Sequence, residues 1–539
     1  MARVKIDGHL ILSYESENYR EIYWTSLSKH IIKKYGNAEF TEHTLVETIL
    51  LDCFQFLIDE FKNLISEETT TSFFNYVFYL NEESWEFLVK TRGGLPFGEI
   101  DENDFSRYRR ILKLTLEQGC DIDLTSGKFP TSQEVYRMDD KIQRLFYLGT
   151  WFYTFADYIA FHKMIPNAKK INFDENDFIG VYWQKHYDNS YNQLFPKLGA
   201  DYAKGVFDEN AVDELKKAIN DCFSINYDYA GGLIFEIKKH FSDSQFQTIE
   251  PYVLPINLSA QFKVDKETAE CFYNGLSISR ENKQSIEDVI YKPYSTERYM
   301  YRPILIYQID GVSRALVGKG KFGESIYVLA TNAISWNTIP LEWRKNKCML
   351  KYMSRKGNEH DSILEDKVEE IIRKQGLRFV RNIKSFKRPD TDNINIDNEI
   401  AGEIDFILID EKRNRIIVAD SKYNKAKYEA VGFRTDNTNF ITKYEPKLKK
   451  KIDWIAGNKL IVQEHFKIIY NIDDFDISKY EVIGLFFINT PTFYMFNGAY
   501  KAITLNQLDN YLSEDFEEVS VSYTNEEGVD SIIKHPYFN

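Results

Sequence analysis

The stretch from Gly402 to Asn424, GEIDFILIDEKRNRIIVADSKYN, places charged side chains inside two otherwise apolar segments. Burying a charge is costly unless the charge is paired or bound to a metal ion. The residues concerned are Glu403, Asp405, Asp420 and Lys422. Two acids and a lysine suit the hydrolysis of a phosphodiester, which needs oxygen ligands for a metal ion and a group that orients water or stabilises developing charge.

The two apolar segments are expected to form a β-hairpin through the charged turn DEKRN. Because side chains on a strand alternate between faces, Asp420 and Lys422 point the same way. The hairpin would place Asp405 opposite positions 418 to 420. Two close carboxylates repel each other, and a divalent cation with oxygen ligands relieves the repulsion. Mg²⁺ is therefore the expected cofactor, with Asp405 and Asp420 as ligands and Lys422 as the helper of the nucleophile.

Neighbouring segments indicate the fold that would hold this hairpin. A helix is expected over Lys356–Gly376, with Asp361 as its N-cap and a glycine after its last turn. A strand over Leu377–Ile383, a polar loop and the hairpin follow, and then come a helix at about Asn439–Ala456 and the strand YEVIGLFFINT. This order predicts an α/β unit built around a mixed sheet.

The pattern resembles the PD-(D/E)xK nuclease superfamily, in which a helix carries one acid and two neighbouring strands carry an Asp and a (D/E)xK tripeptide. Here ILEDKVEEIIRKQG supplies Glu365, with Glu369 one turn on as the alternative, GEIDFIL supplies Asp405, and VADSKY supplies Asp420 and Lys422. The resemblance covers only Lys356 to the early 490s.

The resemblance implies a restriction-endonuclease-like mixed sheet flanked by helices, and a metal-dependent cleavage of DNA. It implies that the three acids bind Mg²⁺ or Mn²⁺, with the carbonyl of Ser421 as a further ligand. Lys443 and Lys447, one turn apart on the following helix, are expected near the phosphate, with a solvated lysine face as the alternative. Glu403 is either a further ligand or a charge at the rim of the site, and the loop Arg388–Asp397 either touches DNA or is merely exposed.

The remainder of the chain divides by its pattern into two further regions. Residues 1–245 are mainly helical, and their aromatic stripes indicate core packing. Residues 246–344 contain short β-favouring runs, among them PYVLPINLSAQF, YRPILIYQI, SRALVGKG and SIYVLATNAISW, and predict a mixed or β-rich segment. The segment GKGKFG matches GxGxxG, but both of its flanks suggest strands, so we expect a hairpin turn rather than a nucleotide-binding loop. Residues 345–539 hold the nuclease-like unit and a C-terminal extension.

Charge and cysteine content set further bounds. The net charge of −14 is unusual for a protein that binds nucleic acid, but residues 341–480 hold 29 Lys and Arg against 24 Asp and Glu, so the basic residues gather around the proposed site. The 5 cysteines are scattered and show no zinc-binding spacing, which is typical of a reducing cytoplasm. No apolar run is long enough for a membrane span, and the start lacks a signal peptide.

The large N-terminal part suggests a module that senses, recruits or restrains the nuclease. This arrangement is similar to bacterial restriction or anti-phage defence proteins with a C-terminal PD-(D/E)xK effector, and a homodimer is expected by the same resemblance. Two other classes stay open: a nuclease fold that has lost activity and binds nucleic acid, and a regulatory interaction protein. Metal dependence would distinguish the first from an enzyme, and co-purification of a partner would indicate the second.

Overall fold

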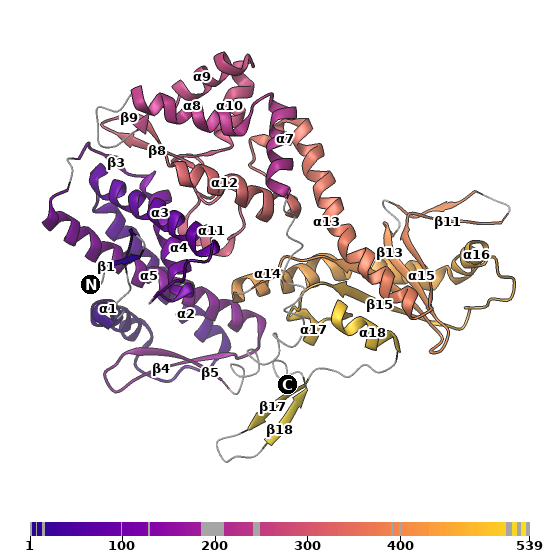
Figure 1. Ribbon diagram of the computed structural model, residues 1–539. Coiled ribbons are helices and arrows are strands. Elements are labelled where there is room, and N and C mark those ends of the chain that lie inside the picture. Colours follow the sequence, from indigo (N-terminus) through magenta and orange to yellow (C-terminus); the bar gives the residue numbers. More distant parts are fainter. Residues whose placement is uncertain are drawn as a thin grey trace.

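Figure 1 shows the computed structural model of the chain. It describes residues 3–534 except residues 7, 13–16, 99, 128–129, 185–209, 241–247, 390–391, 398–400, 428, 514–519 and 525–529. The chain is a mixed α/β protein in which a helical bundle comes first, a middle region with a small sheet second, and a C-terminal region with a larger sheet last.

The N-terminal region is a bundle of long helices, as predicted. Its main helices are α1 (Glu17–Tyr35), α2 (His43–Ser66), α3 (Thr71–Arg92), α4 (Glu102–Gly119) and α5 (Ser132–Met164). Apolar side chains of α2 at three- and four-residue spacing, such as Val46, Leu50 and Leu57, are fully buried. A capping box, in which Thr131 and Glu134 each accept a hydrogen bond from the other's backbone N–H, fixes the start of α5.

The middle region contains a small mixed sheet. Its strands are β3 (Asp123–Leu124), β6 (Thr248–Ile249), β7 (Ser277–Ile278), β8 (Ile304–Ile309) and β9 (Val312–Val317). The order is β3-β8-β9-β6, with β7 also paired to β8. The hairpin of β8 and β9 confirms the prediction for YRPILIYQI and SRALV. Because β3 comes from the N-terminal region, the small sheet joins the first two regions.

Two segments expected to favour β structure are helices instead. They are α9 (Val253–Phe262), within PYVLPINLSAQF, and α12 (Lys319–Asn332), which contains most of SIYVLATNAISW. Phe322, Ile326 and Leu329 are spaced by four and three residues and bury one face of α12 in the core of the middle region. This packing of a helical face outweighs the local β preference of the apolar run.

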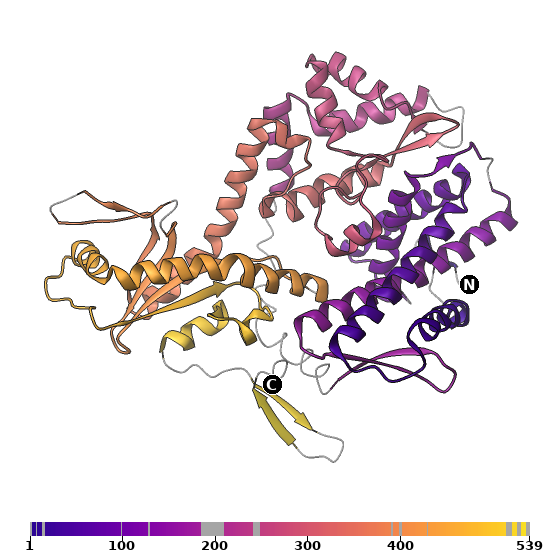
Figure 2. The same cartoon turned by 180° about the vertical axis from the view of Figure 1, so that it is seen from behind.

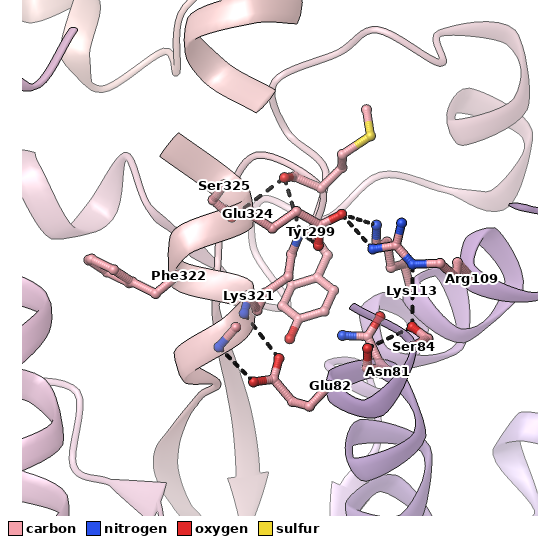
Figure 3. Close-up of polar contacts among 12 residues, drawn as sticks. Asn81, Glu82, Ser84, Arg109, Lys113, Tyr299, Lys321, Phe322, Glu324 and Ser325 are labelled. Carbon is pink, nitrogen blue, oxygen red and sulfur yellow. Dashed lines mark hydrogen bonds and ion pairs between the residues drawn. The ribbon is translucent and has the colours of Figure 1, made fainter. Parts of the chain in front are cut away.

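The glycine segment GKGKFG does not form the expected hairpin turn, because it joins β9 to the helix α12. The backbone N–H groups of Gly320 and Lys321 donate to the carboxylate of Glu82 over 2.9 and 3.1 Å, as Figure 3 shows. A Cβ on Gly318 would lie 2.3 Å from that carboxylate, so the close approach requires glycine. The N–H groups at the start of α12 are therefore already satisfied by a carboxylate from the chain itself.

Buried charges fix α12 against the N-terminal bundle. The carboxylate of Glu324 accepts from Arg109 and Lys113 of α4 over 2.8 and 2.7 Å, and from Lys321 over 2.8 Å (Figure 3). All four side chains are largely buried. These contacts hold the first two regions together as one packed body.

A single helix, α13 (Lys347–Lys374), connects the middle region to the C-terminal sheet. The sequence predicts a shorter helix that begins near Asp361, but the N-cap is Asn346, whose side chain accepts from the N–H groups of Cys348 and Met349. The helix ends before Gly376, which has φ +68°, so the expected terminal glycine is confirmed. The first half of α13 packs in the middle region, through residues such as Met349, and its second half packs on the C-terminal sheet.

The C-terminal sheet has five strands in the order β10-β13-β14-β15-β16. They are β10 (Arg378–Ile383), β13 (Ile404–Asp410), β14 (Arg415–Lys422), β15 (Glu481–Ile488) and β16 (Lys501–Thr504). The pairs β10–β13 and β13–β14 are antiparallel, and the pairs β14–β15 and β15–β16 are parallel. The expected mixed sheet is confirmed, and α13, β10, β13, β14 and β15 follow one another in the expected order. Where a single helix is expected between β14 and β15, the chain forms more than one, and β16 adds a strand that was not expected.

Helices cover both faces of this sheet (Figure 2). They include α13 and α18 (Leu505–Ser513) on one face and α15 (Glu445–Gly457) and α16 (Lys459–Tyr470) on the other. Leu364 of α13 packs with Phe406 and Ala419, whereas Leu448 of α15 packs with Ile407 and Val418. Odd-numbered residues of β13 and even-numbered residues of β14 therefore face α15.

The C-terminal region also contacts the N-terminal bundle directly. Helix α14 (Ala430–Asn439) lies against α5, and Ala430 and Val431 belong to the N-terminal core. Phe433 packs with Met164 at the end of α5. The segment that follows the strand β14 is thus held by another region of the chain.

The structure places one disulfide, between Cys222 and Cys348, which joins α7 (Ala211–Phe223) to the start of α13. Cys53, Cys120 and Cys271 are free. No helix among the described residues combines the length and apolar character needed to span a bilayer.

Candidate active site

Asp405 and Asp420 lie side by side on neighbouring strands. Phe406 of β13 pairs with Ala419 of β14, so the next residues along, Asp405 and Asp420, lie opposite each other. Both side chains lie on the sheet face that α15 covers, by the alternation described above. One carboxylate oxygen of Asp405 accepts a hydrogen bond of 2.7 Å from the backbone N–H of Ser421. The predicted pairing of two carboxylates at this edge is confirmed.

Two lysines flank Asp420. Lys422 Nζ lies 3.3 Å from one carboxylate oxygen of Asp420 and donates to the carbonyl of Ser421 over 3.1 Å. Lys451 of α15 donates to the other carboxylate oxygen. The side chains of Asp420 and Lys451 are 2% and 8% exposed, whereas that of Lys422 is 21% exposed. Asp420 is thus a buried anion with a cation on each side, and Lys422 is the more exposed of the two cations.

These charges shift the pKa values of the two acids in opposite directions. Burial raises the pKa of Asp405 to about 6, with Asp420 adding to the rise and the two lysines opposing it. Burial also works against ionisation of Asp420, but Lys422 and Lys451 outweigh it and lower its pKa. The pKa of Lys422 rises because the carboxylates outweigh the effect of burial. Asp420 therefore stays ionised, while Asp405 takes up a proton in mildly acidic solution.

The residues at this edge fit a hard divalent cation. The carboxylates of Asp405 and Asp420 and the carbonyl of Ser421 are oxygen donors, which Mg²⁺ and Mn²⁺ prefer. Burial is the main cause of the raised pKa of Asp405, and the neighbouring carboxylate of Asp420 adds to the rise. Within the described part of the chain, no third His, Cys, Asp or Glu side chain lies close enough to these two acids to form a three-residue metal-binding cluster. The described residues contain one cluster of that kind, formed by His9, Glu83 and Glu86 in the N-terminal region.

Glu365 is engaged with another partner. Its carboxylate accepts a hydrogen bond of 3.1 Å from Arg381 of β10, and Asp366 and Glu369 accept from the same guanidinium over 2.7 Å. The helix α13 packs on the sheet face opposite to that of Asp405 and Asp420. Both alternatives for the helix-borne acid, Glu365 and Glu369, thus lie around Arg381, and the structure does not bring either into the group formed by Asp405, Asp420 and Lys422.

The lysines expected at the phosphate are exposed. Lys443 lies in a short π-helical turn, η4 (Phe440–Tyr444), and Lys447 in α15. The π-helical turn changes the residue spacing between them from that of a regular α-helix. The nearby Lys451, which contacts Asp420, was missed as a site residue. Its spacing in the sequence could have indicated this role. Lys451 lies on the same buried face of α15 as Leu448 and Ile455, and a buried lysine needs a buried partner.

Two of the remaining candidates lie at the edge of the site region. Glu403 pairs with Lys384 over 3.3 Å, and its side chain is 38% exposed, which agrees with a rim charge. In the loop Arg388–Asp397, residues 390 and 391 lie outside the described residues. Ile394 and Asn395 form β12, which pairs with β11 (Ser385–Phe386) beyond the main sheet.

The segment after Lys422 is fixed by all three regions. Asn424 exchanges two hydrogen bonds with the side chain of Asn489, over 2.7 and 2.8 Å. Lys425 Nζ lies 4.0 Å from the ring centre of Tyr294 in the middle region. At the start of α14, Glu429 pairs with Arg110 of α4 over 2.7 Å. The ion pair between Glu429 and the N-terminal bundle therefore lies only a short distance along the chain from Lys422.

No protein-family model, curated protein or solved structure matches this chain. The chemistry of the site must therefore be inferred from the side chains themselves. The buried Asp420, the partly buried Asp405 and the partly exposed Lys422 lie at one end of two adjacent inner strands. Such a group can bind a divalent cation, hold a phosphate and orient a water molecule.

Proposed function

We propose that the C-terminal region is a metal-dependent nuclease that hydrolyses phosphodiester bonds in DNA, with a restriction-endonuclease-like arrangement of its sheet and helices. The observation that carries the proposal is the convergence of Asp405, Asp420 and Lys422 on one face of two paired strands. The order of the strands and the cover of both sheet faces by helices support it.

In this proposal Asp405, Asp420 and the Ser421 carbonyl would hold Mg²⁺ or Mn²⁺, which when bound polarises the phosphate and lowers the pKa of a water molecule. Lys422 donates to a nonbridging phosphate oxygen or orients the attacking water, because its ammonium is the partly exposed cation of the pair. The buried Lys451 helps to lower the pKa of Asp420 and so keeps its carboxylate ionised. The hydrogen bond from the Ser421 N–H fixes the carboxylate of Asp405 against its neighbour.

The test is cleavage of plasmid, linear duplex and single-stranded DNA by the purified protein with Mg²⁺, with Mn²⁺ and with EDTA. Asp420→Ala and Lys422→Ala should lower the cleavage rate by roughly 10²-fold or more, as the loss of charge-stabilising groups commonly does. Glu403→Gln is the matched control, since it removes an exposed carboxylate from the start of the same hairpin. Unchanged rates in both alanine variants would refute the assignment of the site.

A second candidate function has its own support. Lys422 and Lys451 already balance the charge of Asp420, and Arg381 binds Glu365, so this edge could bind nucleic acid without cutting it. Binding of Mn²⁺, followed by its electron paramagnetic resonance signal, separates the two. A nuclease should bind Mn²⁺ and lose that binding in Asp405→Asn. A protein that binds DNA equally well with EDTA and neither binds Mn²⁺ nor cleaves would favour the binding function.

We also propose that the N-terminal region controls the site. The contacts of α14 with α5, and of Glu429 with Arg110, connect the segment after Lys422 to the helical bundle. A protein partner or ligand that repositions the bundle would act on this segment directly. DNA as the substrate, a dimeric state and a role in defence against phage follow only from the resemblance. The cleavage assays test the first, and mass measurement in solution tests the second.

A further inference from the structure

A cavity of about 410 Å³ lies in the N-terminal bundle, remote in sequence from the candidate active site. It is bounded by α1, α5 and the strand β5 (Ile179–Trp183), which pairs with β4 (Lys169–Phe173) in a hairpin beside α1 (Figure 1). Cavities of this size are typical of small-molecule sites. Most of its side chains are aromatic: Trp24, Tyr147, Trp151, Phe155, Tyr158 and Tyr182.

The aromatic side chains form a fixed floor and a more accessible wall. Trp24 and Phe155 are buried, and the indole N–H of Trp24 donates to the carbonyl of Ile179 over 3.0 Å. The ring of Trp151 lies 4.3 Å from that of Trp24, and Tyr182 is 47% exposed at the opening. A Cβ at Gly180 would lie 2.4 Å from the hydroxyl of Tyr182, so glycine allows that ring to lie along the strand. Flat ligands stack well on such surfaces.

One corner of the cavity carries positive charge. Arg20 is the charged residue among those that line the cavity, and its side chain is 58% exposed. Its guanidinium lies 3.8 Å from one carboxylate oxygen of Asp174, while the other oxygen accepts from the N–H groups of Asn176 and Phe178. The guanidinium carbon also lies 5.3 Å from the ring centre of Phe178. Tyr147 is buried beside it, and burial raises the pKa of its hydroxyl to about 12 against the opposing effects of a hydrogen bond with Trp151 and the charge of Arg20. The described lining contains no carboxylate, which disfavours a cationic ligand.

We propose that this cavity binds a nucleotide, with its base against Trp151 and Tyr182 and its phosphate at Arg20. Aromatic faces attract a base of any sequence, and a guanidinium binds phosphate with directed hydrogen bonds. The nucleotide is either free or an unstacked unit of a single strand, since both present the same chemistry. This inference does not depend on the nuclease activity of the C-terminal region.

The experiment is isothermal titration calorimetry of the full chain with AMP, adenosine, a short oligodeoxyadenylate and choline. AMP should bind in a saturable manner. Trp151→Leu should weaken AMP and adenosine by roughly 5-fold to 100-fold, the usual range for loss of a stacked base. Arg20→Gln should weaken AMP by roughly tenfold while adenosine is unaffected, because only AMP carries the phosphate. Tyr136→Leu, on the same helix but 64% exposed and outside the cavity, is the control and should bind as the wild type does.

The two sources of the ligand give different results. Tighter binding of the oligonucleotide than of AMP indicates an unstacked unit of a strand, and tighter binding of AMP indicates a free nucleotide. Absence of AMP and oligonucleotide binding at millimolar concentration would overturn the proposal, as would tighter binding of choline than of AMP. Because Arg20 is exposed, Arg20→Gln should fold normally, and equal binding of AMP by this variant would also overturn it.

Discussion

Replacing Lys451 by methionine tests the electrostatic interpretation of the candidate site most directly. The change keeps the apolar stem of the side chain and removes its ammonium, which leaves Asp420 buried with Lys422 as its one adjacent cation. Removing one partner of a buried ion pair typically destabilises a protein by about 3 to 5 kcal/mol. Because Lys422 stays 3.3 Å away, we expect the lower end, about 3 kcal/mol.

Hydrogen exchange of β14, followed by mass spectrometry, measures this loss within the C-terminal region. A change of about 3 kcal/mol should speed exchange of the β14 amides roughly hundredfold. The double variant Asp420→Asn with Lys451→Met should exchange more slowly than Lys451→Met alone, because it leaves no uncompensated buried charge. Added Mg²⁺ should slow exchange in Lys451→Met more than in the wild type, since a bound cation would replace the missing ammonium.

The control is Lys449→Met, because Lys449 lies on the same helix but pairs with Asp453 at the surface. Exchange of β14 in that variant should match the wild type. If Lys451→Met also matched the wild type and the double variant showed no coupling, Lys451 would not be a partner of Asp420 and the description of the site would be wrong.

Three further predictions concern other parts of the chain. The raised pKa of Asp405, about 6, means that the folded state favours the protonated form of this side chain. Its contribution to the free energy of unfolding is therefore present below about pH 4 and is lost as the pH rises through 6. Thermal melts of Asp405→Asn should lack this loss of stability between about pH 4 and 6. Cys222→Ser should lower the free energy of unfolding by about 2 to 4 kcal/mol, and a reducing agent should do the same to the wild type but not to the variant. Arg110→Gln should destabilise the docking of α14 by at most about 1 kcal/mol, because the side chains of Arg110 and Glu429 are both more than a third exposed. Hydrogen exchange of the α14 amides would measure this effect. Exchange as slow as in the wild type would exclude a role of the ion pair in docking.

The hairpin with its two acids could be predicted from the sequence because the information is local. Charged residues at Asp405 and Asp420 interrupt apolar runs, a short turn sets the register, and alternation sets the face. The mixed sheet and the order of α13, β10, β13, β14 and β15 followed from the same patterns, whereas β16 and the additional helices between β14 and β15 did not. Lys451 could not be placed in the same way, because its partner lies 31 residues away and the contact depends on how α15 packs across the sheet.

The errors in the middle region have a common cause. The runs that became α9 and α12 are short and apolar, and such runs fit a strand or a buried helix equally well by composition. The cradle that the GKGKFG segment forms for Glu82 depends on a residue more than 200 positions earlier, so the local pattern carries no sign of it. The sequence does not predict the start of α13 at Asn346, because the residues that follow are largely polar. The first turns of this helix pack on the middle region and not on the C-terminal sheet.

Because α13 is one continuous helix, it fixes how the core of the middle region and the core of the C-terminal sheet are rotated relative to each other. Each residue added to an α-helix rotates the later part of the helix by about 100° and advances it by about 1.5 Å. One residue inserted near Gly357, between the half that packs with Met349 and the half that packs through Leu364, would turn the C-terminal sheet relative to the middle region. The contact of α14 with α5 could not then form at the same time, so the length of α13 sets whether the three regions can all make their contacts at once.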